Sequence, residues 1–357
     1  MALTTSNPIQ IHKLPQHTYI DALRWLPHLS TFTRHILLAT YDSDTSTPSL
    51  QTLTFSPSQN TPTLTPQASI SAPSRITSLK VSPSPFTPSK PLIAAAIFSG
   101  SVLFYSADLI NGSLNFEYSV PEEGFHSGPV SGIDLNENGS ECVSVGEDGK
   151  VNLVSLGDKG GFRRVFDSNG LVSYSSVKWA SPVEFVTGGF GFGLHWWDQR
   201  KGGGPVALFK GNWTGGNASG IVHSIDIHPS RKHTCLAGGS SGTVFAWDIR
   251  SPKQPLILSG FGANDVPANS LVESDIWEIQ YDNYTHSSKI SNPTSSRVLP
   301  AMICSEDGIL GVIEQGEEPI ELLAEPCAIN SFDIDRQNPS DVMCSLEWES
   351  IAILSRP

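Results

Sequence analysis

The chain has 357 residues, a formal net charge of −13 and a low share of charged residues, 16%, beside 31 glycines and 26 prolines. Proteins built from long exposed helices carry more Lys, Glu and Arg than this, so an all-α fold is disfavoured. The excess of 35 Asp and Glu residues over 22 Lys and Arg residues disfavours direct binding of nucleic acid or of an anionic membrane surface. No apolar run approaches the roughly 18 residues that a membrane-spanning helix requires.

Residues 9–14 alternate apolar and polar side chains, in the order Ile-Gln-Ile-His-Lys-Leu, and predict a β-strand near the N-terminus. No basic region followed by a long apolar run accompanies this strand, so no signal peptide is expected. Five cysteines are scattered along the chain without a Cys-x-x-Cys pair, which favours buried free thiols over disulfides or a metal site.

A four-residue pattern, apolar-polar-apolar-polar, then recurs along the chain and is often followed by proline. Its seven copies lie 44 to 56 residues apart and begin at Leu23, Leu79, Ile133, Val177, Ile225, Ile279 and Phe332. A second apolar run, a tight turn and a third run follow; in the fifth copy these are residues 234–237, 240–242 and 243–249. In two other copies the turn reads Glu-Asp-Gly, at 147–149 and 306–308, and Asp-Gly in this setting predicts a type I′ turn with positive φ at both central residues.

A fourth apolar run follows most copies, at residues 50–55, 114–118, 164–166, 206–209, 256–258 and 320–323. Four short strands in about 40–50 residues match the size of one propeller blade. The seventh copy ends without a fourth strand, whereas the strand at 9–14 precedes the first copy. The sequence therefore predicts an all-β fold, a single seven-bladed β-propeller over residues 1–357, whose last blade is completed by the N-terminal strand.

Nine prolines, mixed with Ser and Thr, lie between residues 47 and 91. Seven of them follow a Ser or Thr, at positions 47, 56, 61, 65, 82, 84 and 87, and these pairs have the form of proline-directed kinase sites. Phosphates there would add negative charge to an acidic chain and could repel a partner. The other interpretation is long loops rich in turn-forming residues, with flexible loops at 59–66 and 86–90.

Motifs for catalysis or cofactor binding are weak in this chain. The glycine-rich run at 188–193 resembles a phosphate-binding loop but is not followed by Lys-Ser/Thr and a helix, so it predicts a hairpin turn. The ten histidines are dispersed, and Asp134, Asp226 and Asp333 are interpreted as ordinary polar positions of the first strands. We therefore expect no catalytic residue, no metal, no cofactor and no enzymatic activity.

Two Trp-Asp pairs, Trp197-Asp198 and Trp247-Asp248, end strands at equivalent places in the fourth and fifth copies. Together with the Glu-Asp-Gly turns, they resemble the WD-repeat family. The resemblance implies the family's His/Asp/Trp hydrogen-bond network within blades. This network is expected to be complete in few blades, because only two of the seven copies keep the Trp-Asp pair.

A narrower resemblance is to the nucleoporin 43 family, the small WD-repeat members of the Y-shaped outer-ring subcomplex of the nuclear pore. Residues 145–153, Val-Gly-Glu-Asp-Gly-Lys-Val-Asn-Leu, are similar to the third blade of that family. Residues 247–256, 277–279 and 304–308 are similar to its fifth and sixth blades, and 329–353 to its last. The resemblance covers roughly residues 125–357, while the first 120 residues match only in architecture.

This resemblance implies a non-enzymatic scaffold protein of the nuclear pore complex, in the nucleus at the nuclear envelope. Such a protein supports pore assembly, nucleocytoplasmic transport and mRNA export. The implied partners are nucleoporins of the Y-shaped subcomplex, namely the subunit of its α-helical arm and a second propeller carried by that arm. Neither direct contact with nucleic acid nor membrane insertion is expected, and the chain is expected to be a monomeric propeller within the hetero-complex.

Both Trp-Asp pairs extend to WDxR boxes, which end at Arg200 and Arg250. These boxes resemble the motif by which some propellers bind the damaged-DNA-binding adaptor of cullin–RING ubiquitin ligases, and they imply a substrate receptor as the alternative function. An Arg beyond the strand end can make a bidentate contact with such a partner. In the other interpretation, Trp and Asp are structural and Arg caps a surface turn. Trp213, in the glycine-rich segment 211–220, is either a loop anchor or an exposed contact for a partner.

Overall fold

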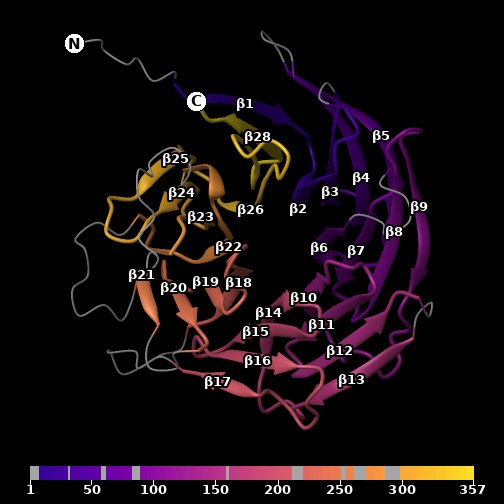
Figure 1. Cartoon of the computed structure of the whole chain (residues 1–357). Coiled ribbons are helices and arrows are strands. Elements are labelled where there is room, and N and C mark those ends of the chain that lie inside the picture. The colour runs from indigo at the N-terminus through magenta and orange to yellow at the C-terminus, as the bar shows by residue number, and fades with distance from the viewer. Residues whose placement is uncertain are drawn as a thin grey trace.

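The computed structural model describes residues 8–30, 33–57, 62–82, 89–157, 161–210, 220–250, 255–260, 271–285 and 298–357. Within these ranges, 28 strands form seven four-stranded antiparallel sheets that stand as blades around a central axis (Figure 1). One end strand of each sheet lies nearest the axis and the other lies at the rim. The predicted seven-bladed β-propeller is confirmed.

The blades follow one another along the chain. Blade 1 comprises β2 (Tyr19–Trp25), β3 (Arg34–Asp42), β4 (Thr47–Ser56) and β5 (Thr63–Ser71), and blade 2 comprises β6 (Ile76–Ser82), β7 (Leu92–Ile97), β8 (Val102–Asp108) and β9 (Ser113–Ser119). Blade 3 comprises β10 (Val130–Leu135), β11 (Glu141–Gly146), β12 (Lys150–Ser155) and β13 (Phe162–Asp167), and blade 4 comprises β14 (Tyr174–Ser181), β15 (Glu184–Gly189), β16 (Leu194–Asp198) and β17 (Ala207–Phe209). Blade 5 comprises β18 (Val222–Ile227), β19 (Thr234–Gly239), β20 (Val244–Asp248) and β21 (Leu256–Ser259), and blade 6 comprises β22 (Ile276–Tyr281), β23 (Ala301–Ser305), β24 (Ile309–Ile313) and β25 (Ile320–Ala324). Blade 7 comprises β26 (Ile329–Ile334), β27 (Asp341–Leu346), β28 (Ser350–Ser355) and, from the other end of the chain, β1 (Gln10–Pro15).

Strand β1 closes the ring, as predicted. It pairs antiparallel with β28 through six residue pairs, from Gln10↔Ser355 to Pro15↔Ser350. The strand nearest the N-terminus thus becomes the outer strand of the last blade, with the C-terminus beside it (Figure 1). This pairing covers the backbone groups of β28, which would otherwise form an open sheet edge.

The core lies between neighbouring blades, where both faces of each sheet are covered. Leu37 and Ala39 of blade 1 pack in one buried cluster with Ile93 and Ala95 of blade 2, all four fully buried. Strands covered on both faces read as continuous apolar runs rather than as alternating patterns, which is why the second strand of each copy is so apolar. All five cysteines are free and buried, so the prediction of buried thiols is confirmed.

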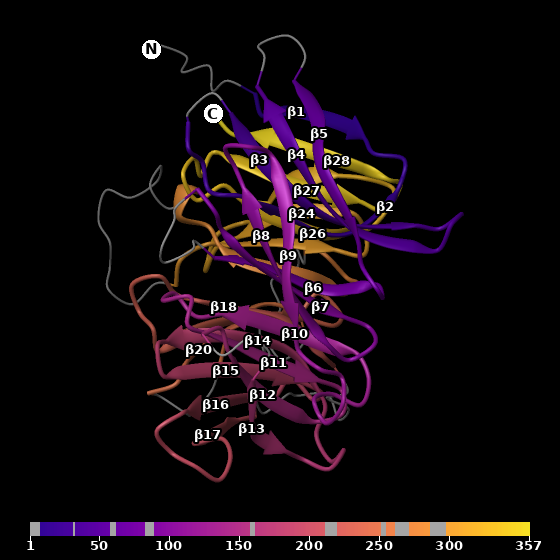
Figure 2. The same cartoon turned by 90° about the vertical axis from the view of Figure 1, so that its right-hand side faces the viewer.

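The rim of the ring is formed by the outer strands. Figure 2 views the molecule from the side, with β5 and β9 toward the viewer. In the part of the chain that the structure describes, no helix has the length and apolar character needed to cross a membrane.

Blade 1 corrects two predictions. Residues 50–55 belong to the third strand, β4, and the fourth strand is β5, which includes residues 63–66 of the predicted flexible loop. The prolines concealed this strand from the sequence pattern. Pro66 is tolerated because it lies in the outer strand, at a shift in the β4–β5 register. Residues 59–61 and 86–88 of the predicted loops lie outside the described residues, while Ser89 and Lys90 lie in a bend.

The seven Ser/Thr-Pro pairs have different surroundings. Thr47, Ser56 and Thr65 are exposed strand residues, whereas Ser82 is buried, with 5% of its surface exposed. The pairs at 61, 84 and 87 lie outside the described residues. Burial keeps Ser82 from a kinase in the folded chain, and phosphorylation of the exposed three stays a prediction.

The Glu-Asp-Gly turns differ from the predicted type I′ geometry. Gly149 has a φ of +75°, but Asp148 has no positive φ. The N–H of Gly149 donates to the carbonyl of Gly146 at 3.1 Å, so the glycine follows the two central turn residues instead of being one of them. The prediction was wrong because the Asp148 carboxylate folds back and accepts the N–H of Lys150 at 3.1 Å. The 306–308 turn repeats this arrangement, with φ +79° at Gly308.

The glycine-rich run at 188–193 forms the predicted hairpin turn between β15 and β16. Gly191 and Phe192 have φ values of +71° and +52°, so both central residues have the positive φ of a type I′ turn. Ser241 and Gly242 repeat this pair of positive φ values in blade 5.

Candidate interaction surfaces

The two flat faces of the ring carry different connections. Because the strands of a blade are antiparallel, the turn between its second and third strands lies on the same face as the connection into the next blade. Direct contacts join the two: the Ser173 hydroxyl donates to the Glu147 carbonyl at 2.8 Å, and the N–H of Glu325 donates to the Gly308 carbonyl at 2.9 Å. We call this side the hairpin face and the opposite side the loop face.

The central channel contains a cavity of about 130 Å³ with a predominantly polar lining. Arg24 and Lys80 are among the residues that line it. They occupy a position of the inner strand that recurs in all seven copies, as Arg24, Lys80, Asp134, Lys178, Asp226, Gln280 and Asp333. Three of these residues are cationic and three are acidic, so the positions nearly balance in charge around the ring. Burial, together with Lys178 and Arg24, lowers the pKa of Lys80 to about 8.

The three aspartates at this position link neighbouring blades. Asp134, Asp226 and Asp333 each accept a hydrogen bond from a backbone N–H of the next inner strand; the donors are Trp179, Tyr281 and Trp25, at 2.9, 2.9 and 2.8 Å. The three aspartates are polar positions of the inner strands, as interpreted, and in addition each of them links two blades. The recurrence of a polar residue at one place in every copy was the signal in the sequence, but the bonding partner lies in another copy.

Arg24 makes a similar link across the channel side of the ring. Its guanidinium forms an ion pair with Glu278 at 2.6 Å and donates to the carbonyl of Leu79 in the next blade at 3.2 Å. Lys178 forms an ion pair with Asp226 at 3.3 Å. Arg24, Lys178 and the three aspartates are therefore joined to other charged groups or to backbone groups of neighbouring blades. Among the residues that the structure describes, no group of three His, Cys, Asp or Glu side chains is arranged to hold a metal ion.

The tryptophans of the WDxR boxes are core residues. Trp197 and Trp247 each expose 1% of their surface. The indole N–H of Trp197 donates to the Thr187 hydroxyl at 3.0 Å, and its ring stacks on Phe185 at 5.7 Å. Trp247 packs against Phe209 with ring centroids 5.3 Å apart. Because both indoles are buried, neither is accessible to a partner. This corrects the prediction that Trp197 and Trp247 contact a partner and leaves the Asp and Arg of each box as predicted contacts.

The aspartate of each box holds its arginine. Asp198 accepts hydrogen bonds from Nε and Nη2 of Arg200, both at 2.8 Å, and from its N–H at 3.0 Å. Asp248 binds Arg250 in the same way, at 3.0, 2.7 and 3.0 Å. The side chains of the two arginines are 65% and 64% exposed. The hydrogen bonds from Arg200 lower the pKa of Asp198 to about 2.

The side-on pair of donors of each guanidinium, Nε and Nη2, is therefore occupied by the aspartate of its own box. A partner that approaches Arg200 or Arg250 meets the end-on pair, Nη1 and the outer N–H of Nη2, and this pair can still make a bidentate contact. The seventh residue predicted as a partner contact, Trp213, lies outside the described residues.

Blade 3 contains a buried hydrogen-bond network that the sequence pattern did not locate. His126 bonds to Asp148 through Nδ1 and to Ser144 through Nε2, both at 3.0 Å. The Asn152 amide lies 3.0 Å from His126 Nε2 and takes part in the network of a blade that has no tryptophan. Burial alone would raise the pKa of Asp148, but hydrogen bonds from His126 and from the Ser127 N–H outweigh it and hold that pKa well below its usual range.

Replacement Asp148→Asn is expected to destabilise the fold by about 1–2 kcal/mol at pH 7, because charge-assisted hydrogen bonds are lost at a site that solvent partly reaches. The pKa of Asp148 is lower in the folded chain than the usual unfolded value of about 3.9. The contribution of its carboxylate to the stability of the fold is therefore complete above about pH 4 and declines as the pH falls further. Chemical denaturation of both proteins between about pH 3 and 7 tests this. A difference in unfolding free energy that stays constant down to pH 3 would contradict it.

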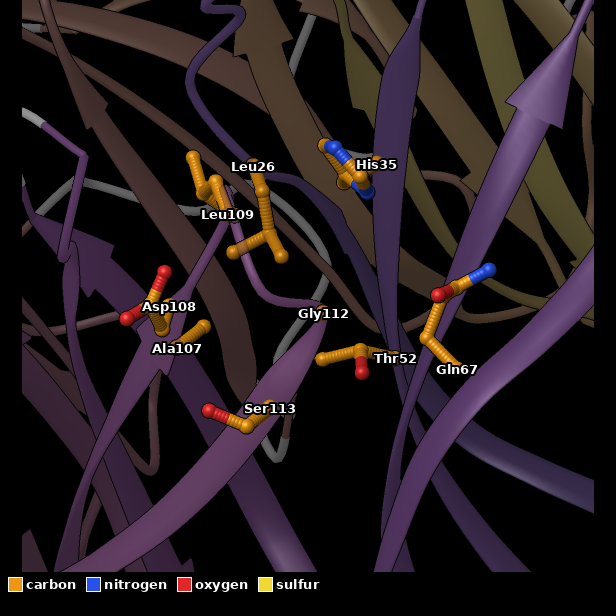
Figure 3. A pocket seen from close by; sticks show the side chains of 9 residues that line it. All are labelled: Leu26, His35, Thr52, Gln67, Ala107, Asp108, Leu109, Gly112 and Ser113. Atoms are coloured by element: carbon orange, nitrogen blue, oxygen red, sulfur yellow. The ribbon is translucent and has the colours of Figure 1, made fainter.

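A small cavity lies between blades 1 and 2 (Figure 3). His35, Thr52 and Gln67 face it from blade 1, and Ala107, Asp108 and Ser113 from blade 2. Its volume of about 10 Å³ suffices for one water molecule at most. This gap is a packing feature and cannot hold a cofactor.

Comparison with known proteins decides the family. No family model matches the chain. The chain is 57% identical over 358 residues to the nuclear pore complex protein NUP43 of Arabidopsis thaliana, and the match covers 98% of each protein. The chain belongs to the Nup43 family. Nucleoporin Nup43 of Mus musculus is 28% identical over 228 residues, which cover 61% of this chain and 52% of the mouse protein. Nucleoporin Nup43 of Homo sapiens is 26% identical over 227 residues, with the same coverage of 61% and 52%.

The Nup43 family match extends the resemblance seen in the sequence motifs. The prediction that it stops near residue 125 was wrong, because the Arabidopsis match covers 98% of the chain and so includes most of blades 1 and 2. The repeat motifs of blades 1 and 2 differ too much from the family pattern to be recognised individually. Membership of the Nup43 family also identifies the propeller as a non-enzymatic WD-repeat nucleoporin, and it does not favour the alternative of a cullin–RING substrate receptor.

Proposed function

We propose that this chain is a scaffold subunit of the nuclear pore complex, a rigid propeller that binds other nucleoporins at the nuclear envelope. The observation that carries the proposal is the 57% identity over 98% of the chain to the nuclear pore complex protein NUP43 of A. thaliana. The role is structural: the chain supports pore assembly and, through it, nucleocytoplasmic transport and mRNA export.

The partners are other nucleoporins. The finer proposal is that the chain binds the α-helical arm of the Y-shaped subcomplex, near a second propeller carried by the same arm, and that it is monomeric apart from this assembly. The ring supports a binding role, because short turns on a rigid core form its faces. The net charge of −13 favours protein partners over nucleic acid.

Affinity purification from nuclear envelopes tests two statements: that the chain binds nucleoporins, and that these nucleoporins belong to the Y-shaped subcomplex. The full chain carries an N-terminal tag, and the bound proteins are identified by mass spectrometry. We expect nucleoporins of the Y-shaped subcomplex, and we expect none of them with an unrelated WD-repeat propeller as bait. Recovery of nucleoporins from other subcomplexes alone would overturn the finer proposal, and recovery of no nucleoporin would overturn the function itself.

A further inference from the structure

Trp348 is an exposed tryptophan on the hairpin face. It lies at the tip of the β27–β28 hairpin, and 66% of its surface is exposed. Leu346 pairs with Ser350 across the hairpin, so the loop consists of three residues, 347–349, with Glu349 at φ +61°. Tryptophan is enriched among the residues that carry protein–protein contacts, so an indole held outward on so short a turn is a candidate contact residue.

Carboxylates flank this tryptophan in the chain, at Glu347 and Glu349, and others lie on neighbouring elements of the hairpin face. The turn of blade 6, the connection from blade 6 to blade 7 and the turn of blade 7 are joined in series, because the N–H of Glu325 donates to Gly308 at 2.9 Å and the N–H of Glu347 donates to Ala328 at 3.0 Å. Along this series lie the exposed Glu306, Asp307 and Glu347 and the half-buried Glu325 and Glu349. The exposed Glu273, in the connection from blade 5 to blade 6, joins them because its N–H donates to the Asp307 carboxylate at 3.0 Å. We call these residues and Trp348 the Trp348 sector.

The Trp348 sector is strongly negative. Lys13 forms an ion pair with Glu325 at 2.6 Å, and it is the cation that contacts the sector among the described residues. The Asp307 carboxylate accepts backbone N–H groups of Glu273 and Ser274, and Glu306 accepts the indole N–H of Trp277. These bonds fix the carboxylates in place without neutralising them, so several negative charges stay fixed beside an exposed aromatic ring.

We infer that the Trp348 sector docks a lysine- and arginine-rich segment of another nucleoporin, with the indole of Trp348 packed against a cationic side chain. A cation over a tryptophan face is attracted by the ring, and the alkyl stem of Lys or Arg covers the apolar area. Surrounding carboxylates orient such a segment and speed its association. A second copy of this chain would bring a like-charged sector to the same place and be repelled. The inference rests on the proposed function.

Site-specific photo-cross-linking identifies the occupant. The change Trp348→p-benzoylphenylalanine keeps an aromatic residue at the tip, and Ile110→p-benzoylphenylalanine is the control, because Ile110 is 73% exposed on the loop face between β8 and β9. After irradiation of assembled nuclear pore complexes, we expect position 348 to cross-link to a Lys- and Arg-rich peptide of a nucleoporin. A cross-link to a second copy, to an acidic or uncharged peptide, or to no nucleoporin would overturn the inference.

A charge change on the sector gives the matched test. With the cross-linker at position 348, the double change E273K/E347K is expected to lower the cross-link yield about tenfold. The double change E123K/E318K alters the net charge equally at two exposed residues outside the sector and is expected to leave the yield unchanged. Equal loss in both double variants would mean that net charge alone matters and would overturn the inference.

The results distinguish a wrong assignment of the Trp348 sector as a docking surface from a wrong proposed function. Thermal unfolding of each variant first confirms an intact ring. If the E273K/E347K chain still recovers nucleoporins in the usual amounts and its cross-link yield is unchanged, the surface is wrong and the proposed function stands. If the unaltered chain recovers no nucleoporin, the proposed function fails.

Discussion

Deletion of residues 1–15 is expected to lower the thermal unfolding midpoint by about 10 °C or more and to make the chain associate with itself. The deletion removes β1, which pairs with β28 through six residue pairs. At about 1 kcal/mol for each lost hydrogen bond, the backbone pairing alone amounts to about 5 kcal/mol. Leu14 also packs against the cluster that contains Ile351 and Ile353, so the deletion exposes apolar surface as well as an open strand edge.

Deletion of residues 1–8 is the matched control, because it leaves β1 intact and should leave the midpoint unchanged. Differential scanning calorimetry and size-exclusion chromatography measure the two effects. A synthetic peptide of residues 8–17, added in excess to the chain that lacks residues 1–15, should restore part of the lost stability by mass action. Equal unfolding midpoints for the two deletions would mean that the stability of the ring does not depend on the pairing of β1 with β28.

The repeat pattern predicted the fold because every blade has to bury its inner strands in the same way. An inner strand packed between two neighbours needs apolar residues on alternate positions, and a second strand covered on both faces needs a continuous apolar run. These requirements recur in every copy, so seven inner strands and the missing fourth strand of the last copy were visible in the sequence. The complementary strand, predicted at residues 9–14 and found at Gln10–Pro15, was visible for the same reason.

The parts that sequence reasoning missed depend on contacts between copies. Asp134 bonds to Trp179, 45 residues away, and Asp333 bonds to Trp25 at the opposite end of the chain. No local pattern encodes such a partner. Strand β5 was missed because Pro66 resembles a loop residue, although an outer strand tolerates it. The exposed tip at Trp348 was missed because exposure follows from the hairpin geometry and not from the residue type.

Replacement Arg34→Met is expected to lower the free energy of unfolding by about 3–5 kcal/mol, because it leaves buried carboxylates without their cation. Arg34 lies at the seam where blade 7 meets blade 1 and is itself buried, with 8% exposed. It forms ion pairs with Asp335, at 3.3 Å, and with Asp341, two side chains that are also buried. Its guanidinium also lies over the Trp25 ring, 5.5 Å from the centroid. Methionine keeps much of the packing volume and removes the charge.

The triple change R34M/D335N/D341N is the control, since it removes the carboxylates together with the cation and should recover most of the lost stability.

The pH dependence adds a second readout. Burial alone would raise the pKa of Asp335, but hydrogen bonds from His28 and from backbone N–H groups hold it below its usual value in the intact seam. Loss of Arg34 removes the ion pair at 3.3 Å, which also favours the charged form of Asp335. The deficit in unfolding free energy of the single variant should therefore be largest near pH 7 and shrink as the pH falls toward about 4, where Asp335 can take up a proton. Guanidinium denaturation at several pH values measures this, and a deficit that is equally large in the triple variant would show that Arg34 acts through its packing and not through its charge.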